Sequence, residues 1–154
     1  MKLKIARKTR LNGKSFGYIR VSTAGQNPDR QKAEMEALGI PESCIYVDYA
    51  SGKDFDHPQY QALRRAVRKG DVIYFDSLDR LGRNYEEIKK EWLYLSEEAE
   101  ADLVCLDIRQ MDTREFKKYS EGTGRFIEGL VLSMLSWRSD RERPEILRLS
   151  ASKN

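Results

Sequence analysis

Residues 16–23 read FGYIRVST, and this stretch decides the fold because it is an apolar, β-prone run that ends in Arg20, Val21 and Ser22. Successive side chains of a strand point to opposite faces of a sheet, so Arg20 and Ser22 are expected to leave one face together. A second strand-like run, DVIYFD at residues 71–76, leads into LDRLGR at residues 78–83. If these strands are parallel neighbours, both motifs open on the same edge of the sheet.

Strand-like and helix-like segments alternate along the rest of the chain. Pro28 suits the first turn of one helix and Gly39 ends it, whereas Asp56 can cap the next helix and Gly70 ends it. Asn84 can cap a third helix. This alternation predicts an α/β fold with a mainly parallel, four- or five-stranded sheet flanked by helices. Strands are expected near residues 16–21, 45–48, 71–76 and 102–108, and helices near 27–38, 58–69 and from 84 onward.

A long amphipathic helix is expected after the glycine-rich stretch at residues 122–124. Its apolar residues recur at three- and four-residue spacing, and such a stripe either covers the sheet or forms an oligomer seam. We divide the chain into a basic N-terminal extension (1–15), an α/β catalytic domain (16–121), a long oligomerisation helix (122–143) and a tail (144–154), with no helix-turn-helix domain. The stripe comprises Phe126, Ile127, Leu130, Val131, Met134 and Leu135.

The composition suits one domain, since the chain has 154 residues and 40% hydrophobic content. Its net charge is only +3, but basic residues gather before Ser15, where an arm can be solvated or can contact nucleic-acid phosphates. No apolar stretch approaches the length of a membrane span, so we expect a cytoplasmic protein with no membrane partner. Cys44 and Cys105 lack the CxxC spacing of a metal or redox site and are expected to be buried thiols.

The residues at the predicted strand ends suggest phosphate chemistry. Guanidinium groups bind phosphate oxygens through paired hydrogen bonds, and Arg20, Arg80 and Arg83 can stabilise a pentacoordinate phosphoryl transition state without a metal. Ser22 would then attack phosphorus and form a phosphoserine ester that conserves the bond energy. Taken singly, Ser22 could instead cap a helix, and Asp79 could form a surface ion pair with Arg80. Taken together, the two motifs favour a catalytic site without a cofactor.

These motifs resemble serine site-specific recombinases of the resolvase/invertase group, especially those of Gram-positive mobile elements. The resemblance extends from Phe16 to about Arg143 and rests on YIRVST at residues 18–23, SGKDF at 51–55 and LDRLGR at 78–83. It implies that Ser22 cuts each strand of double-stranded DNA, forming a 5′-phosphoserine link and a free 3′ hydroxyl. Homodimers would join into a synaptic tetramer that exchanges and religates the ends.

The resemblance also implies a role for each matching residue. Arg20, Arg80 and Arg83 would hold the scissile phosphate. Asp79 would orient an arginine or help to move a proton to the leaving oxygen. The other implied site residues are Gln26 and Gln31 as supporting polar groups, and Lys53 and Arg143 as DNA contacts.

Two residues depart from the pattern of the similar proteins. His57 stands where they usually carry arginine, and as a lone histidine it is expected to be a polar surface residue rather than a base. Pro144 enters a stretch that should remain helical. The alternative function is therefore a truncated or degenerate, non-catalytic remnant that only dimerises or binds the DNA backbone. Hydrolysis of a small phosphorylated molecule is a third interpretation, but the chain has neither a Walker-type loop nor a metal-ligand motif.

Overall fold

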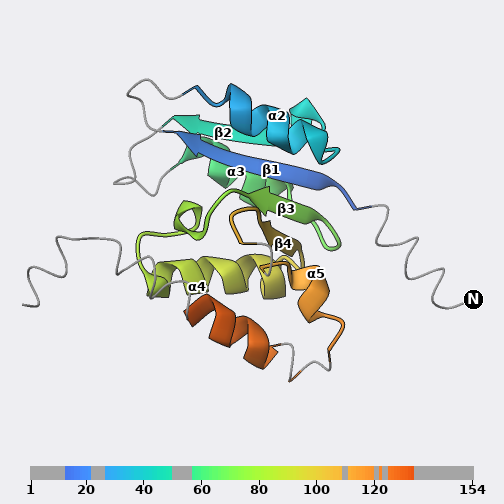
Figure 1. Cartoon of the computed structure of the whole chain (residues 1–154), viewed down its shortest axis with the longest axis vertical. Coiled ribbons are helices and arrows are strands. Elements are labelled where there is room, and N and C mark those ends of the chain that lie inside the picture. Colours follow the sequence, from blue (N-terminus) through green and yellow to red (C-terminus); the bar gives the residue numbers. More distant parts are fainter. Residues whose placement is uncertain are drawn as a thin grey trace, which may run out of the picture.

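The computed structural model describes residues 13–21, 27–49, 57–108, 111–119, 122 and 125–133. Its centre is a sheet of four parallel strands in the order β2-β1-β3-β4 (Figure 1). This arrangement confirms the predicted α/β fold with a parallel sheet flanked by helices. The strands are β1 (Ser15–Val21), β2 (Ile45–Tyr49), β3 (Val72–Phe75) and β4 (Asp102–Cys105).

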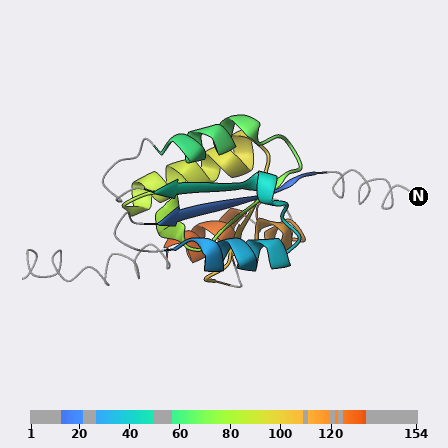
Figure 2. The same cartoon turned by 90° about the horizontal axis from the view of Figure 1, so that it is seen from above.

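Each pair of consecutive strands is joined by a crossover that contains a helix, as parallel pairing requires. Helix α2 (Asp29–Ala37) joins β1 to β2, α3 (Pro58–Ala66) joins β2 to β3, and α4 (Tyr85–Leu93) joins β3 to β4. Figure 2 shows α3 and α4 on one face of the sheet and α2 on the other. The remaining helical segments are η1 (Glu42–Cys44), η2 (Leu78–Arg80), a π-helical continuation of α4 (Tyr94–Glu98), α5 (Thr113–Phe116) and residues 125–133.

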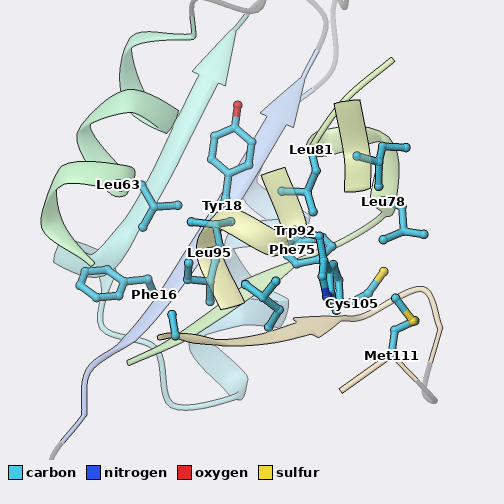
Figure 3. Packing of buried hydrophobic residues seen from close by; sticks show 14 of the residues in the cluster. Phe16, Tyr18, Leu63, Phe75, Leu78, Leu81, Trp92, Leu95, Cys105 and Met111 are labelled. Carbon is cyan, nitrogen blue, oxygen red and sulfur yellow. The ribbon is translucent and has the colours of Figure 1, made fainter. Parts of the chain in front are cut away.

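The alternation of side chains along β1 creates a core on each face of the sheet. Tyr18 joins the larger cluster, which includes Trp92 of α4 (Figure 3). Ile19 points to the opposite face and packs with Met35 of α2. Gly17 shares that second face, where a Cβ would lie only 2.3 Å from the Met35 sulfur. The glycine therefore allows α2 to approach β1 closely.

The helix that was expected over residues 58–69 ends earlier, at Ala66. Val67 adopts an extended backbone and buries its side chain in the core. The N–H of Arg68 donates to the Asp71 carboxylate at 2.7 Å rather than to a helical carbonyl. This capture of a backbone donor explains why the helix stops before the glycine that was expected to end it.

The edge of the sheet at β4 is shorter than the sequence indicated. The strand expected over residues 102–108 ends at Cys105, and a turn follows at Leu106 and Asp107. The Cys105 N–H donates to the carbonyl of Met111 at 2.9 Å, and the returning chain forms one antiparallel bridge at Asp112. In the described part of the chain, the possible fifth strand is therefore only a bridge.

Helical residues 125–133 pack along α4 (Figure 1). Leu132 is buried in the same cluster as Trp92, whose indole N–H donates to the Glu128 carboxylate. The Tyr85 hydroxyl lies 3.3 Å from the Ser133 hydroxyl. These contacts attach the helix to the catalytic domain that was predicted from the sequence.

The apolar stripe of this helix is divided between two faces. Ile127 and Val131 pack against the larger core cluster, so this side of the helix contributes to the core. Phe126 and Leu130 are 66% and 48% exposed, and they form an outward-facing pair one helical turn apart. The last two members of the predicted stripe, Met134 and Leu135, lie outside the described residues.

No helix in the described part of the chain is both long enough and apolar enough to cross a membrane. Cys44 is half-buried and Cys105 is buried, and both are free thiols. The assignment of residues 1–15 and 144–154 as an extension and a tail remains a prediction.

Candidate active site

The two sequence motifs meet at the carboxyl edge of the sheet. Strands β1 and β3 are parallel neighbours, while β2 lies on the other side of β1. Ligand sites in open α/β sheets lie at such a reversal of strand order. Arg20 is near the end of β1, and its NH2 group donates to the backbone carbonyl of Asp79 in η2 at 3.0 Å. This hydrogen bond joins the YIRVST and LDRLGR motifs.

Arg20 has a second neighbour in His57, which precedes the first residue of α3. The Arg20 NH1 group lies 3.2 Å from Nε2 of His57. His57 is only 3% exposed, so the expectation that it is a polar surface residue is wrong. The start of α3 packs over β1 and places the imidazole against the strand-end arginine.

Arg80 is held by a carboxylate from its own loop. Its Nε and NH2 groups donate to the two oxygens of Asp76 at 2.9 Å and 3.1 Å. Such a paired contact fixes the plane of the guanidinium group. Asp79 lies farther away, with 3.7 Å between Oδ2 and the Arg80 NH1 group, and it accepts a hydrogen bond from the Ser77 hydroxyl. The simple surface pair of Asp79 with Arg80 is therefore the weaker of the two contacts.

The site places two cations, Arg20 and Arg80, beside the carboxylates of Asp76 and Asp79. Burial, and then the positive charge of Arg80, lower the pKa of Arg20 from its ordinary value. Burial also acts to lower the pKa of Arg80, but the hydrogen bonds and charge of Asp76 outweigh it and raise that pKa. Both side chains stay charged at physiological pH because an arginine pKa lies far above it. A bound phosphate group would relieve the repulsion between the two cations.

A buried carboxylate, Asp48 near the end of β2, joins β2 to β1 and to the start of α3 beside the site. It is 3% exposed and accepts hydrogen bonds from the N–H groups of Gln59 at 3.0 Å and Tyr60 at 2.9 Å. It also accepts one from the Tyr18 hydroxyl at 3.0 Å. Burial, followed by the charge and hydrogen bond of Asp48, raises the pKa of Tyr18, so its hydroxyl remains a donor.

Asp48 was not among the site residues predicted from the sequence, although its position at a strand end was a usable signal. The Asp48 carboxylate caps α3 from a neighbouring strand, whereas the N-cap residue His57 makes no side-chain capping bond. Asp56, the expected cap, lies outside the described residues. Asp48 therefore connects β1, β2 and the start of α3.

The end of the LDRLGR motif shapes the entry into α4. A Cβ on Gly82 would lie 2.7 Å from the backbone nitrogen of Ile88, so only glycine fits there without movement. Asn84 accepts a hydrogen bond from the Glu87 N–H at 3.0 Å, which confirms it as the cap of α4. Arg83 is half-exposed and lies beside Glu87, with 4.0 Å between Nε and Oε2.

Of the remaining predicted site residues, one lies in the described part of the chain. Gln31 is half-buried on α2. The described residues contain no group of three or more side chains suited to hold a metal ion. Outside the described residues lie Ser22, Gln26, Lys53 and Arg143.

Comparison with known proteins agrees with this geometry. The family model "Resolvase, N terminal domain" matches residues 15–148. The chain belongs to the resolvase family. The resolvase-family chain therefore corresponds to the N-terminal catalytic domain of a serine recombinase, as its motifs predicted.

Relatives of the resolvase-family chain include transposon resolvases from different bacteria. It is 40% identical to the Tn501 resolvase of Pseudomonas aeruginosa over 80 residues, which are 52% of this chain and 40% of that protein. It is 31% identical to the Tn1546 resolvase of Enterococcus faecium over 108 residues, or 70% of this chain and 55% of that protein. The chain thus spans about half the length of these relatives, and the likeness is not restricted to Gram-positive sources.

Among solved structures, the resolvase-family chain is similar to the N-terminal catalytic domain of TP901-1 integrase. The TM-score is 0.51 at 26% identity, and the match covers 85% of this chain and 97% of that domain. The similarity therefore extends over almost the whole of that catalytic domain.

Proposed function

We propose that this chain carries out the DNA strand cleavage and religation of site-specific recombination, with Ser22 as the nucleophile. The observation that carries the proposal is the hydrogen bond from Arg20 to the Asp79 carbonyl at 3.0 Å, which brings the two motifs to one strand edge. Ser22 follows Arg20 by two residues, and in a continued strand their side chains share a face. The family membership supports the same chemistry.

The proposed reaction conserves the number of phosphodiester bonds. The Ser22 Oγ attacks the scissile phosphorus, an Oγ–P bond forms, and the bond from phosphorus to the 3′ oxygen breaks. The serine proton leaves, and the departing 3′ oxygen gains a proton in the same step. The 3′ hydroxyl of an exchanged strand then attacks the phosphoserine, restores a phosphodiester and frees the serine. No external energy source is required.

Arg20 and Arg80 are the proposed phosphate ligands, with Arg83 joining them when DNA is bound. Their positive charges would stabilise the additional negative charge of the pentacoordinate transition state. Asp79 holds Arg20 through its backbone and stands close to Arg80 through its side chain, which suits the proposed orienting role. Further contacts to double-stranded DNA are assigned to Lys53 and Arg143, with Gln26 and Gln31 as supporting groups.

The proposed partners include further copies of the chain. The exposed pair Phe126 and Leu130 supplies an apolar surface for a homodimer, and two dimers would form the synaptic tetramer. Replacing Leu130 by glutamate should shift sedimentation toward the monomer without reducing thermal stability, since this side chain is not part of the core. An unchanged profile would refute this use of the surface.

The proposed function can be tested by fusing the chain to a sequence-specific DNA-binding module, which brings the chain to a chosen DNA site. Supercoiled DNA with paired sites should yield a covalent protein–DNA adduct that is absent in Ser22→Ala. Arg80→Lys should reduce adduct formation by about 10²–10³-fold, since it removes paired phosphate contacts. Arg30→Lys is the matched control, because Arg30 is an exposed residue of α2.

A folded and DNA-bound fusion that forms no adduct would contradict the proposal. It would favour a non-catalytic remnant. An adduct that persists in Ser22→Ala would show that another residue is the nucleophile.

A further inference from the structure

We propose that His57 is a positioning residue for Arg20, which it holds at the strand-end site through a neutral imidazole that carries its proton on Nδ1. The catalytic meaning of this inference rests on the proposed function. The contact itself can be tested without catalysis.

The chemistry of the two side chains determines the direction of their hydrogen bond. A guanidinium group has five N–H donors and no acceptor. The distance of 3.2 Å between Arg20 NH1 and His57 Nε2 is that of a hydrogen bond, so Nε2 must be the acceptor. A neutral imidazole that accepts at Nε2 carries its proton on Nδ1. A doubly protonated ring would place one donor against another and lose the contact.

Arg20 is held at both of its terminal nitrogens. NH1 donates to His57 at the start of α3, and NH2 donates to the Asp79 carbonyl in η2 at 3.0 Å. Two acceptors on separate elements define the plane of the guanidinium group. That plane matters because paired binding to a phosphate requires the two N–H groups to face the phosphate oxygens. Without the histidine acceptor, the group could rotate about its remaining bond to Asp79.

The position of His57 is itself determined by buried contacts. Its side chain is 3% exposed, and the next two backbone N–H groups of α3 after Pro58 donate to the Asp48 carboxylate. The start of α3 is therefore attached to β2, and the imidazole is attached with it. The His57 ring is thus a pre-arranged acceptor rather than a surface group that reaches Arg20 by chance.

The charges around the ring determine how the contact responds to pH. The Arg20 cation faces Nε2 directly and opposes protonation of the ring, while the Asp48 anion is committed to three donors. Acidification that protonates His57 should therefore break the contact and release one end of Arg20. Among the described residues, the titratable and charged groups linked to this contact directly or through one neighbour include Tyr18 and Arg20 of β1, Asp48 of β2, Asp79 and Arg80 of η2, and Asp76, which pairs with Arg80.

The chain suits a direct measurement because it contains one histidine. Nitrogen-15 NMR of the whole chain should show a protonated Nδ1 and an unprotonated Nε2 when the ring is neutral. Arg20→Gln should shift the ring toward the Nε2-protonated form, whereas Arg30→Gln on the exposed side of α2 should leave it unchanged. A neutral wild-type ring with its proton on Nε2 would overturn the inference.

Two substitutions separate the acceptor from the volume of the side chain. His57→Gln keeps an acceptor that does not titrate, and His57→Leu removes it. Relaxation of the Arg20 Nε–H signal, assigned by its loss in Arg20→Lys, should show a rigid group in the wild type and His57→Gln and a mobile one in His57→Leu. On acidification, Arg20 should become mobile in the wild type but stay rigid in His57→Gln.

Equal rigidity of Arg20 in all three proteins would refute the positioning role. If His57→Leu does not fold, the acid titrations of the wild type and His57→Gln decide the question, and identical titrations would refute it. The expected tautomer without a covalent DNA adduct would contradict the proposed function but not this inference. A Ser22-dependent adduct with the opposite tautomer would contradict this inference alone.

Discussion

Asp48→Ala should be among the most destabilising substitutions in the chain. The carboxylate accepts three hydrogen bonds at 2.9–3.0 Å and is 3% exposed, so its removal leaves three donors buried without it. Hydrogen bonds to charged groups contribute about 1.5–3 kcal/mol each, and loss of a helix cap costs about 1 kcal/mol. These contributions overlap, because two of the bonds are the cap of α3. We therefore expect a loss of about 3–5 kcal/mol in the free energy of unfolding.

The prediction can be divided among the partners of Asp48 by urea unfolding. Tyr18→Phe removes one donor and should cost about 1 kcal/mol. Asp48→Asn keeps one acceptor oxygen but turns an amide N–H toward a donor, and it should cost about 2 kcal/mol. Asp29→Asn, at an exposed carboxylate of α2, should stay within about 0.5 kcal/mol of the wild type. A cost below about 1 kcal/mol for Asp48→Ala would refute the idea that this carboxylate caps α3.

Three further tests, which use four substitutions, address other parts of the structure. Gly82→Ala should lower the free energy of unfolding in urea by about 1–3 kcal/mol, because the new Cβ would meet the backbone of α4. Gly129 lies in a helix with open space around it, so Gly129→Ala should stabilise the protein by about 0.5–1 kcal/mol. Similar results at both positions would contradict the packing at Gly82. Burial raises the pKa of Cys105 from its ordinary value of 9.0 to about 12. The contribution of this thiol to the free energy of unfolding should therefore be fully present below about pH 9 and be lost as the pH rises toward 12. Cys105→Ala should reduce this alkaline loss of stability. Burial also raises the pKa of Glu128, although the hydrogen bond from Trp92 opposes the shift, so the contribution of this carboxyl to stability is lost as the pH rises. Glu128→Gln should keep an acceptor for Trp92 and reduce this pH dependence of the free energy of unfolding. An unchanged pH dependence would argue against a buried carboxylate at this position.

The elements that could be predicted from sequence depend on short-range patterns. The run at residues 16–21 became β1, and Asn84 caps α4 through a bond to a residue three positions ahead. Pro28 and Pro58 marked the starts of α2 and α3, and Gly39 marked the end of α2. The predicted end of α3 was wrong because the N–H of Arg68, which would have continued the helix, donates to the side chain of Asp71 just before β3.

The contacts of the candidate site were harder to predict because they join distant segments. Tyr18 and Asp48 are 30 residues apart, and Arg20 and His57 are 37 apart. No local propensity indicates that a carboxylate at the end of one strand caps the helix that follows a loop. Likewise, histidine is common on surfaces, but His57 is buried where the start of α3 meets β1.

The sequence by itself determined the alternation of strands and helices, the two motifs and the types of residue available for phosphate chemistry. Hydrogen-bonding propensity and apolar periodicity act over a few residues, so this information can be read along the chain. Only the tertiary structure decided that Tyr18 donates to Asp48, that Arg20 lies between His57 and the Asp79 carbonyl, and which members of the 125–133 stripe face the core. These choices depend on the strand order and on the packing of helices against both faces of the sheet, because only those determine which donors and acceptors are close enough to bond.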